Sequence, residues 1–71
     1  MSASLESLEA LLRVAAQNLD LSASMIRDLG LSPDKNIRKV GEALASIFEI
    51  QHEIYEIRPE LKPDYLKRKK E

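Results

Sequence analysis

The sequence lacks several residue types that small proteins use for cross-linking or catalysis. Its 71 residues include no cysteine, no tryptophan, one histidine and only two glycines. Without cysteine there is no disulfide, no thiolate metal site and no thiol nucleophile. The glycines, Gly30 and Gly41, are isolated and far apart, so they form no phosphate-binding loop. We therefore expect a protein that is not an enzyme, with no catalytic residues, no metal and no other cofactor.

Long hydrophobic runs are also missing. No apolar stretch reaches the roughly 18 residues that a membrane-spanning helix needs. The first residues do not combine a basic stretch with an apolar core, which is the pattern of a secretory signal. These features predict a cytoplasmic protein without a membrane partner, and the lack of cysteine agrees with a reducing compartment.

Charge divides the chain into two parts. The formal net charge is −1, but residues 1–57 carry five Lys/Arg and nine Asp/Glu, whereas residues 58–71 carry six and three. Two prolines, Pro59 and Pro63, lie where the charge changes sign, and helix interiors do not tolerate such a pair. We predict one domain over 1–57 followed by a basic C-terminal tail over 58–71.

Apolar residues in the first half follow a helical heptad spacing. One row consists of Leu5, Leu8, Leu12, Ala15, Leu19, Ser22, Ile26 and Leu29, and a second row consists of Leu11, Val14, Asn18, Leu21 and Met25. At about 100° per residue the two rows cover roughly 200° of a helix over about 4–29. The remaining arc, which includes Glu6, Glu9 and Arg13, is expected to face solvent.

Residues that end the first helix and begin a second follow directly after these rows. Gly30 is placed for a left-handed C-terminal cap, Ser32 for an N-cap, and Pro33 for the first position of a second helix over about 33–57, which Pro59 closes. A connection this short makes the helices antiparallel neighbours. The expected fold is all-α, an antiparallel helical hairpin in which facing residues have numbers that sum to about 63.

The second helix has an equally wide apolar arc, so two helices cannot cover each other. We expect two hairpins to form a four-helix bundle as a homodimer, with burial against a different protein as the alternative. The expected core and dimer interface consists of Leu11, Val14, Asn18, Leu21, Met25, Phe48, Ile50, Gln51, Ile54 and Ile57. Within these arcs Asn18, Ser22 and Gln51 are polar, which is typical of groups that fix register, or else marks where a ligand or partner helix enters.

Two possible site motifs are weak. Glu49 and His52 have the spacing that di-iron bundles use, but they lie well outside the apolar arc, which favours an exposed pair. A helix-turn-helix over 22–40 would present Lys35, Arg38 and Lys39 to DNA, but its first helix is too long and its turn reverses the chain. In shape the expected architecture is similar to plasmid-encoded RNA-binding hairpin dimers and to helical-hairpin secretion chaperones, and shape alone assigns no function.

The tail carries the remaining candidates for a contact with phosphate or with a partner. They are Tyr65, Leu66, Lys67, Arg68, Lys69 and Lys70. Four consecutive cations attract phosphate, and they equally suit a solubilising tail. Leu61, Tyr65 and Leu66 suggest docking on a partner or folding back over the hairpin end. We expect a non-enzymatic interaction module, such as an adaptor, a chaperone-like protein or a regulatory subunit, that binds another protein. The alternative is a small nucleic-acid-binding regulator that uses the tail.

Overall fold

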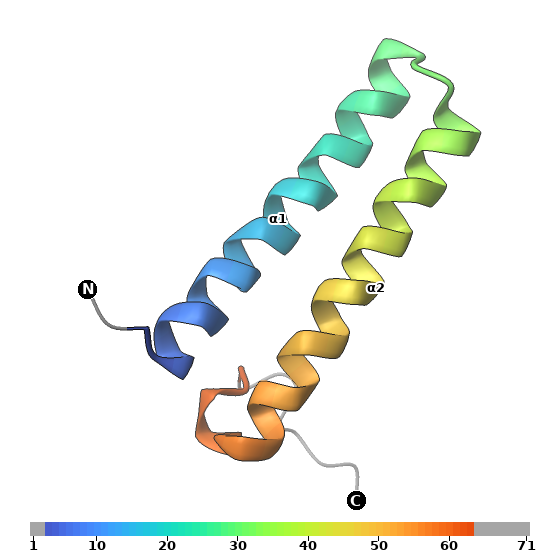
Figure 1. Cartoon of the computed structure of the whole chain (residues 1–71). Helices are drawn as coiled ribbons and strands as arrows, with labels where there is room; N and C mark the ends of the chain where they lie inside the picture. The colour runs from blue at the N-terminus through green and yellow to red at the C-terminus, as the bar shows by residue number, and fades with distance from the viewer. Residues whose placement is uncertain (1–2, 64–71) are drawn as a thin grey trace, which may run out of the picture.

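The computed structural model describes residues 3–63 and is all-helical (Figure 1). Helix α1 spans Leu5–Leu29 and helix α2 spans Pro33–Ile57, and the two lie antiparallel, side by side, along their whole length. A single 3₁₀ turn, η1, spans Pro59–Leu61. The predicted hairpin of two helices of about 25 residues is confirmed.

Both ends of α1 are capped. The Ser4 hydroxyl accepts a hydrogen bond of 3.1 Å from the Ser7 backbone N–H at the start of the helix. At its end Gly30 has φ 67° and ψ 31°, which is the left-handed region. The N–H groups of Gly30 and Leu31 donate to the carbonyls of Arg27 and Ile26, at 3.2 and 3.1 Å. This pair of bonds is a Schellman cap, which confirms the role predicted for Gly30.

The start of α2 differs from the prediction in one detail. Pro33 is the first helical residue and Ser32 occupies the N-cap position, but the Ser32 side chain makes no capping hydrogen bond. The reason is its backbone, which has φ 38° and is left-handed, whereas a side-chain N-cap needs an extended residue. The Asn36 side-chain amide instead donates to the Leu31 carbonyl at 2.8 Å and ties the loop to the helix.

Burial is concentrated at the end of the hairpin opposite the loop. Among residues 3–63, those that are buried are Glu9, Gln51, Ile54 and Tyr55. Ile54 is the most enclosed apolar side chain, with 3% of its surface exposed. Nearer the loop, inward-facing residues such as Leu19, Ile37 and Leu44 are only half-buried. The hairpin therefore has a small core at one end and a partly solvated seam along the rest.

Residues 58–63 turn back over that buried end. Helix α2 ends at Ile57, as the position of Pro59 predicts. The Arg58 guanidinium forms an ion pair of 3.0 Å with Glu6 at the start of α1. The Arg13 guanidinium donates to the Leu61 carbonyl at 3.5 Å. The fold-back considered above is thus present for Leu61, while Tyr65 and Leu66 lie outside the described residues.

Candidate interaction surface

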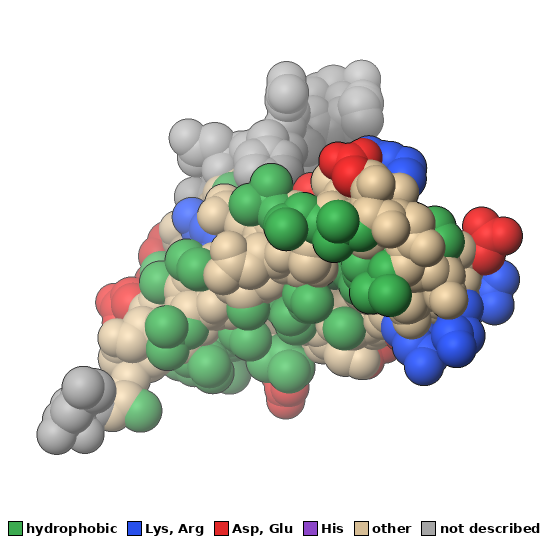
Figure 2. Space-filling view, turned by 90° about the horizontal axis from the view of Figure 1, so that it is seen from above, with side chains coloured by type: hydrophobic (Ala, Val, Ile, Leu, Met, Phe, Trp, Pro, Cys, Tyr) green, Lys and Arg blue, Asp and Glu red, His purple; other side chains and the backbone are tan. Residues whose placement is uncertain are grey.

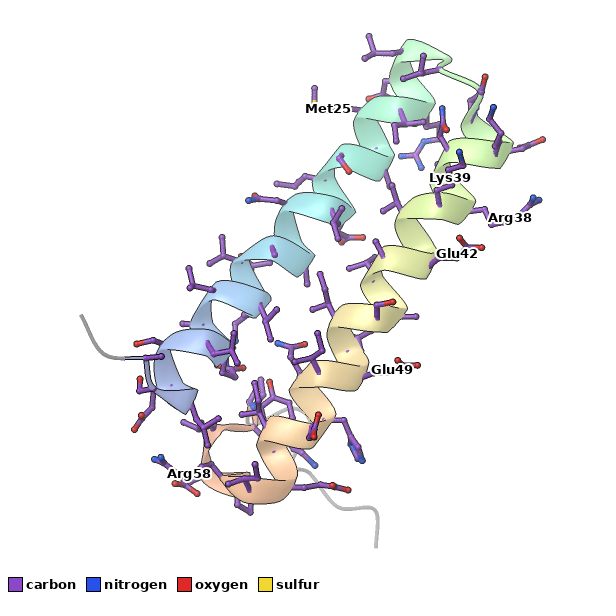
Figure 3. All side chains as sticks on the ribbon, in the orientation of Figure 1. Met25, Arg38, Lys39, Glu42, Glu49 and Arg58 are labelled. Atoms are coloured by element: carbon purple, nitrogen blue, oxygen red, sulfur yellow. The ribbon has the colours of Figure 1, made fainter. Side chains whose placement is uncertain are left out.

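Helix α1 carries a row of exposed hydrophobic side chains on the side that α2 does not cover. Leu11, Leu21 and Met25 keep 68%, 65% and 60% of their surface exposed. Val14 and Leu8 are also exposed. Met25 points away from α2 (Figure 3). These residues belong to the two apolar rows of α1, so the helix is apolar on more sides than a single neighbour can cover.

One hydrogen bond between the helices shows which side of α1 and which side of α2 form the same face of the hairpin. The Tyr55 hydroxyl donates to Glu9 Oε2 at 2.5 Å, so these two residues lie on the same side of the hairpin. At about 100° per residue, Leu8 and Leu11 fall on the other side of α1 from Glu9, and Ile50 and Ile57 fall on the other side of α2 from Tyr55.

These exposed apolar residues therefore share one face of the hairpin. We call it the open face, and it consists of Leu8, Leu11, Val14, Leu21 and Met25 of α1 with Ile50 and Ile57 of α2, Val14 and Leu21 lying at its outer margin. In Figure 2, hydrophobic side chains lie next to one another at the lower left of the molecule, and a group of Lys and Arg side chains lies at the lower right.

The other side of the hairpin holds a polar cluster of Glu9, Arg13 and Tyr55. Glu9 is 4% exposed, and its Oε2 accepts from the Arg13 guanidinium at 2.7 Å as well as from Tyr55. The expectation that Glu9 faces solvent is therefore wrong. Tyr55 reaches across from α2 and covers the carboxylate, and the two donors satisfy one oxygen of the charge, which makes its burial tolerable.

The Glu9 carboxylate shifts the pKa values of the two groups that donate hydrogen bonds to it. Burial raises the pKa of the Tyr55 phenol, and the hydrogen bond to the negative Glu9 carboxylate raises it further. The same carboxylate raises the pKa of the Arg13 guanidinium through their hydrogen bond. Tyr55 is thus held neutral as a donor and Arg13 is held as a cation. This arrangement closes the end of the hairpin and offers no exposed reactive group.

The cluster left a signal in the sequence. Glu9 and Arg13 are four residues apart, the spacing of an ion pair on one helix face. The numbers of Glu9 and Tyr55 sum to 64, close to the predicted pairing sum of 63. Combining these two spacings with the one tyrosine of α2 points to the cluster, whereas helix periodicity alone assigns Glu9 to the solvent.

The predicted interface residues separate into three groups. Leu11, Val14, Leu21, Met25, Ile50 and Ile57 lie on the open face, with the exposed Asn18 in the same row of α1. Gln51 and Ile54 are buried within the hairpin itself. Phe48 is exposed, but it precedes Ile50 by two residues and so lies about 200° around the helix, on the side of the polar cluster. The tail candidates Tyr65, Leu66, Lys67, Arg68, Lys69 and Lys70 lie outside the described residues.

Glu49 and His52, the pair with the di-iron spacing, are both exposed. His52 pairs with Glu56 at 3.1 Å on the surface of α2, and Glu49 points away from α1 (Figure 3). Within residues 3–63, no three His, Asp or Glu side chains come together as metal ligands. Over the same range, the helices do not combine the length and the hydropathy that crossing a bilayer requires.

Charged residues of both signs line the outer side of α2. The first half carries the cations Lys35, Arg38 and Lys39 together with the acids Asp34 and Glu42, and the second half carries Glu49, Glu53 and Glu56. Among the ion pairs within residues 3–63, none involves Lys35, Arg38, Lys39, Glu49 or Glu53. The hairpin alone thus leaves these charges to solvent or to a partner.

Comparison with known proteins identifies no relative: no family model matches the chain, and no curated protein or solved structure is significantly similar to it.

Proposed function

We propose that this protein is a non-enzymatic helical interaction module that acts by binding other protein surfaces through its open face. The observation that carries the proposal is the exposure of Leu11, Leu21 and Met25 on a helix that is otherwise well formed. Large apolar side chains grouped on one face are typical of protein-binding surfaces, whereas scattered ones are ordinary.

A second copy of the chain is the proposed first partner, giving a four-helix bundle. Each helix is about 37 Å long, and two neighbouring helices are about 20 Å wide, so one face offers roughly 700 Å². Two such faces together bury about 1,400 Å², which is the size of a stable interface. The residues that α1 contributes to the open face carry no formal charge, so burying them leaves no unpaired ion.

The proposal is tested by the mass of the protein in solution. Sedimentation velocity or light scattering after size separation should give a dimer at micromolar concentration that dissociates on dilution. Leu11→Glu places a charge in the open face and should give a monomer with unchanged helical circular dichroism, because Leu11 is already exposed in the hairpin. Gln17→Glu adds the same charge on the polar side of α1 and should leave the dimer intact.

Two results would count against this function. If the wild-type protein is a folded monomer at every concentration, a second copy does not occupy the open face. If Gln17→Glu disrupts association as strongly as Leu11→Glu does, the effect comes from net charge and the open face is not the contact.

A further inference from the structure

The edge of α2 next to the open face has a charge pattern with an internal symmetry. Lys39, Ser46 and Glu53 are spaced by seven residues, so each is turned by only about 20° around the helix from the one before it, and all three are exposed. A cation and an anion thus stand at equal distances on either side of a neutral serine. Figure 3 shows Lys39 directed to a different side of α2 from Arg38, Glu42 and Glu49, which point away from α1.

Helix α1 has a matching pattern in its exposed row. Leu11, Asn18 and Met25 are also spaced by seven, with one polar residue between two large apolar ones, and all three are exposed. The numbers of Asn18 and Ser46 sum to 64, as do those of Glu9 and Tyr55, whose hydrogen bond places them at one level. Asn18 and Ser46 therefore mark the same level, near the middle of the hairpin.

From these two patterns we infer how the second copy is oriented. It packs on the open face about a two-fold axis that passes at the level of Asn18 and Ser46, perpendicular to the helices. Each α1 then lies antiparallel to the α1 of the other copy, and each α2 to the other α2. Lys39 of each copy faces Glu53 of the other. The inference rests on the proposed function, because it specifies the partner and the geometry of that same face.

Charge complementarity is what favours this orientation. A two-fold interface is self-complementary, so every contact occurs twice with the roles exchanged. The arrangement across the helices brings unlike charges together at two symmetric positions. The other two-fold, which runs along the helices, places each α2 over the α1 of the other copy, and it sets Lys39 against Met25 and Glu53 against Leu11. Charges left against apolar side chains without a counterpart select against that pairing. Ala43 also falls within about one residue of the position opposite Ile50, which places a small side chain near a large one.

The test exchanges the two charges and measures dimer dissociation by sedimentation equilibrium or by fluorescence exchange. Lys39→Glu alone and Glu53→Lys alone should each weaken the dimer roughly tenfold, since two attractive pairs per dimer become two repulsive ones. The doubly exchanged protein, K39E with E53K, should recover the wild-type dissociation constant. Arg38→Glu is the matched control: the same charge change one residue away points outward and should alter dissociation by less than about twofold.

Mixing the two single variants gives the sharpest outcome. A heterodimer of the Lys39→Glu chain with the Glu53→Lys chain has unlike charges at both positions, so it should form in preference to either homodimer, and raising the salt concentration should reduce the preference. If the wild type dimerises but the single variants and the mixture behave like Arg38→Glu, this orientation is wrong while the dimer stands. If the wild type does not dimerise at all, both the orientation and the proposed second-copy partner fail.

Discussion

The two ends of the hairpin are held together by different means. At the loop end, the chain reverses through Gly30 and Ser32, backbone hydrogen bonds close the turn, and no side chain of residues 22–40 is fully buried. At the other end, α1 and α2 are joined by no short connection. There the Glu9 carboxylate, the Tyr55 hydroxyl and Ile54 are enclosed, and residues 58–63 turn back over them.

This difference follows from chain entropy. Next to a short loop, the helix ends are kept close by the covalent chain, so contacts there cost little ordering. Far from the loop, the same contacts must hold the helices together without that help. The far end therefore needs both an apolar core and specific hydrogen bonds, and these are found there.

The largest effect is expected from truncating the buried apolar residue of the closed end. Ile54→Ala should lower the free energy of unfolding by about 2–4 kcal/mol, because it opens a cavity where the side chain is enclosed. Ile37→Ala removes the same atoms near the loop, where the side chain is half-buried, and should cost about half as much. Urea denaturation at one fixed protein concentration measures both. Equal losses would show that the two ends are packed alike.

A smaller effect is expected from the tyrosine hydroxyl. Tyr55→Phe should lower the free energy of unfolding by about 1–2 kcal/mol, because Glu9 loses a buried donor while Arg13 remains. The pKa of Tyr55 is raised above its usual 10.0 in the folded protein. Its contribution is therefore complete below that value and is lost as pH rises through the folded pKa. Thermal melting should show an alkaline loss of stability near and above about pH 10 that is reduced in Tyr55→Phe.

Residues 58–63 are expected to matter less than the core they cover. A chain ending at Ile57 should unfold more easily than one ending at Pro63 by roughly 1 kcal/mol, because it loses the Arg13 bond to Leu61 and the cover over the closed end. Comparing these two truncations isolates 58–63 from the rest of the tail. Circular dichroism and urea denaturation give the difference. Unfolding of the shorter chain would instead make these residues part of the core.

The smallest effect is expected from the exposed ion pair between Glu6 and Arg58. A hydrogen bond from Arg58 lowers the pKa of the Glu6 carboxyl below its usual 4.5. The contribution of Glu6 is then present above that value and is lost as pH falls through the folded pKa. Glu6→Gln should melt within about a degree of the wild type near pH 7 and converge with it in acid, since exposed pairs stabilise little. A large loss at neutral pH would mean that the pair holds the closed end together.

Local signals predicted the outline of the fold, and contacts between distant residues set its details. Gly30 and Pro59 mark the helix ends because they act through their own backbone. Ser32 occupies the predicted N-cap position but does not make a capping hydrogen bond, since the tight turn requires a left-handed backbone there. Glu9 was assigned to solvent because helix periodicity sorts residues by polarity, and the residue that covers it lies 46 positions away.

The candidate surface was predictable in composition but not in arrangement. The exposed apolar residues of α1 form the second row recognised in the sequence. Their grouping with Ile50 and Ile57, and the separation of Phe48 from them, depend on which side of α2 meets Glu9. A single hydrogen bond decides this, and no periodicity within one helix contains that information.

The place of the polar cluster has a mechanical consequence. Glu9 and Tyr55 stand near the two free ends of the hairpin, so a force that pulls those ends apart acts on this cluster before it reaches any contact closer to the loop. The helices would then separate one turn after another toward Gly30, and each further turn has less buried surface to resist the force. Under load the hairpin should hold until the cluster yields and then open along its length, so its resistance depends on the three side chains of the cluster.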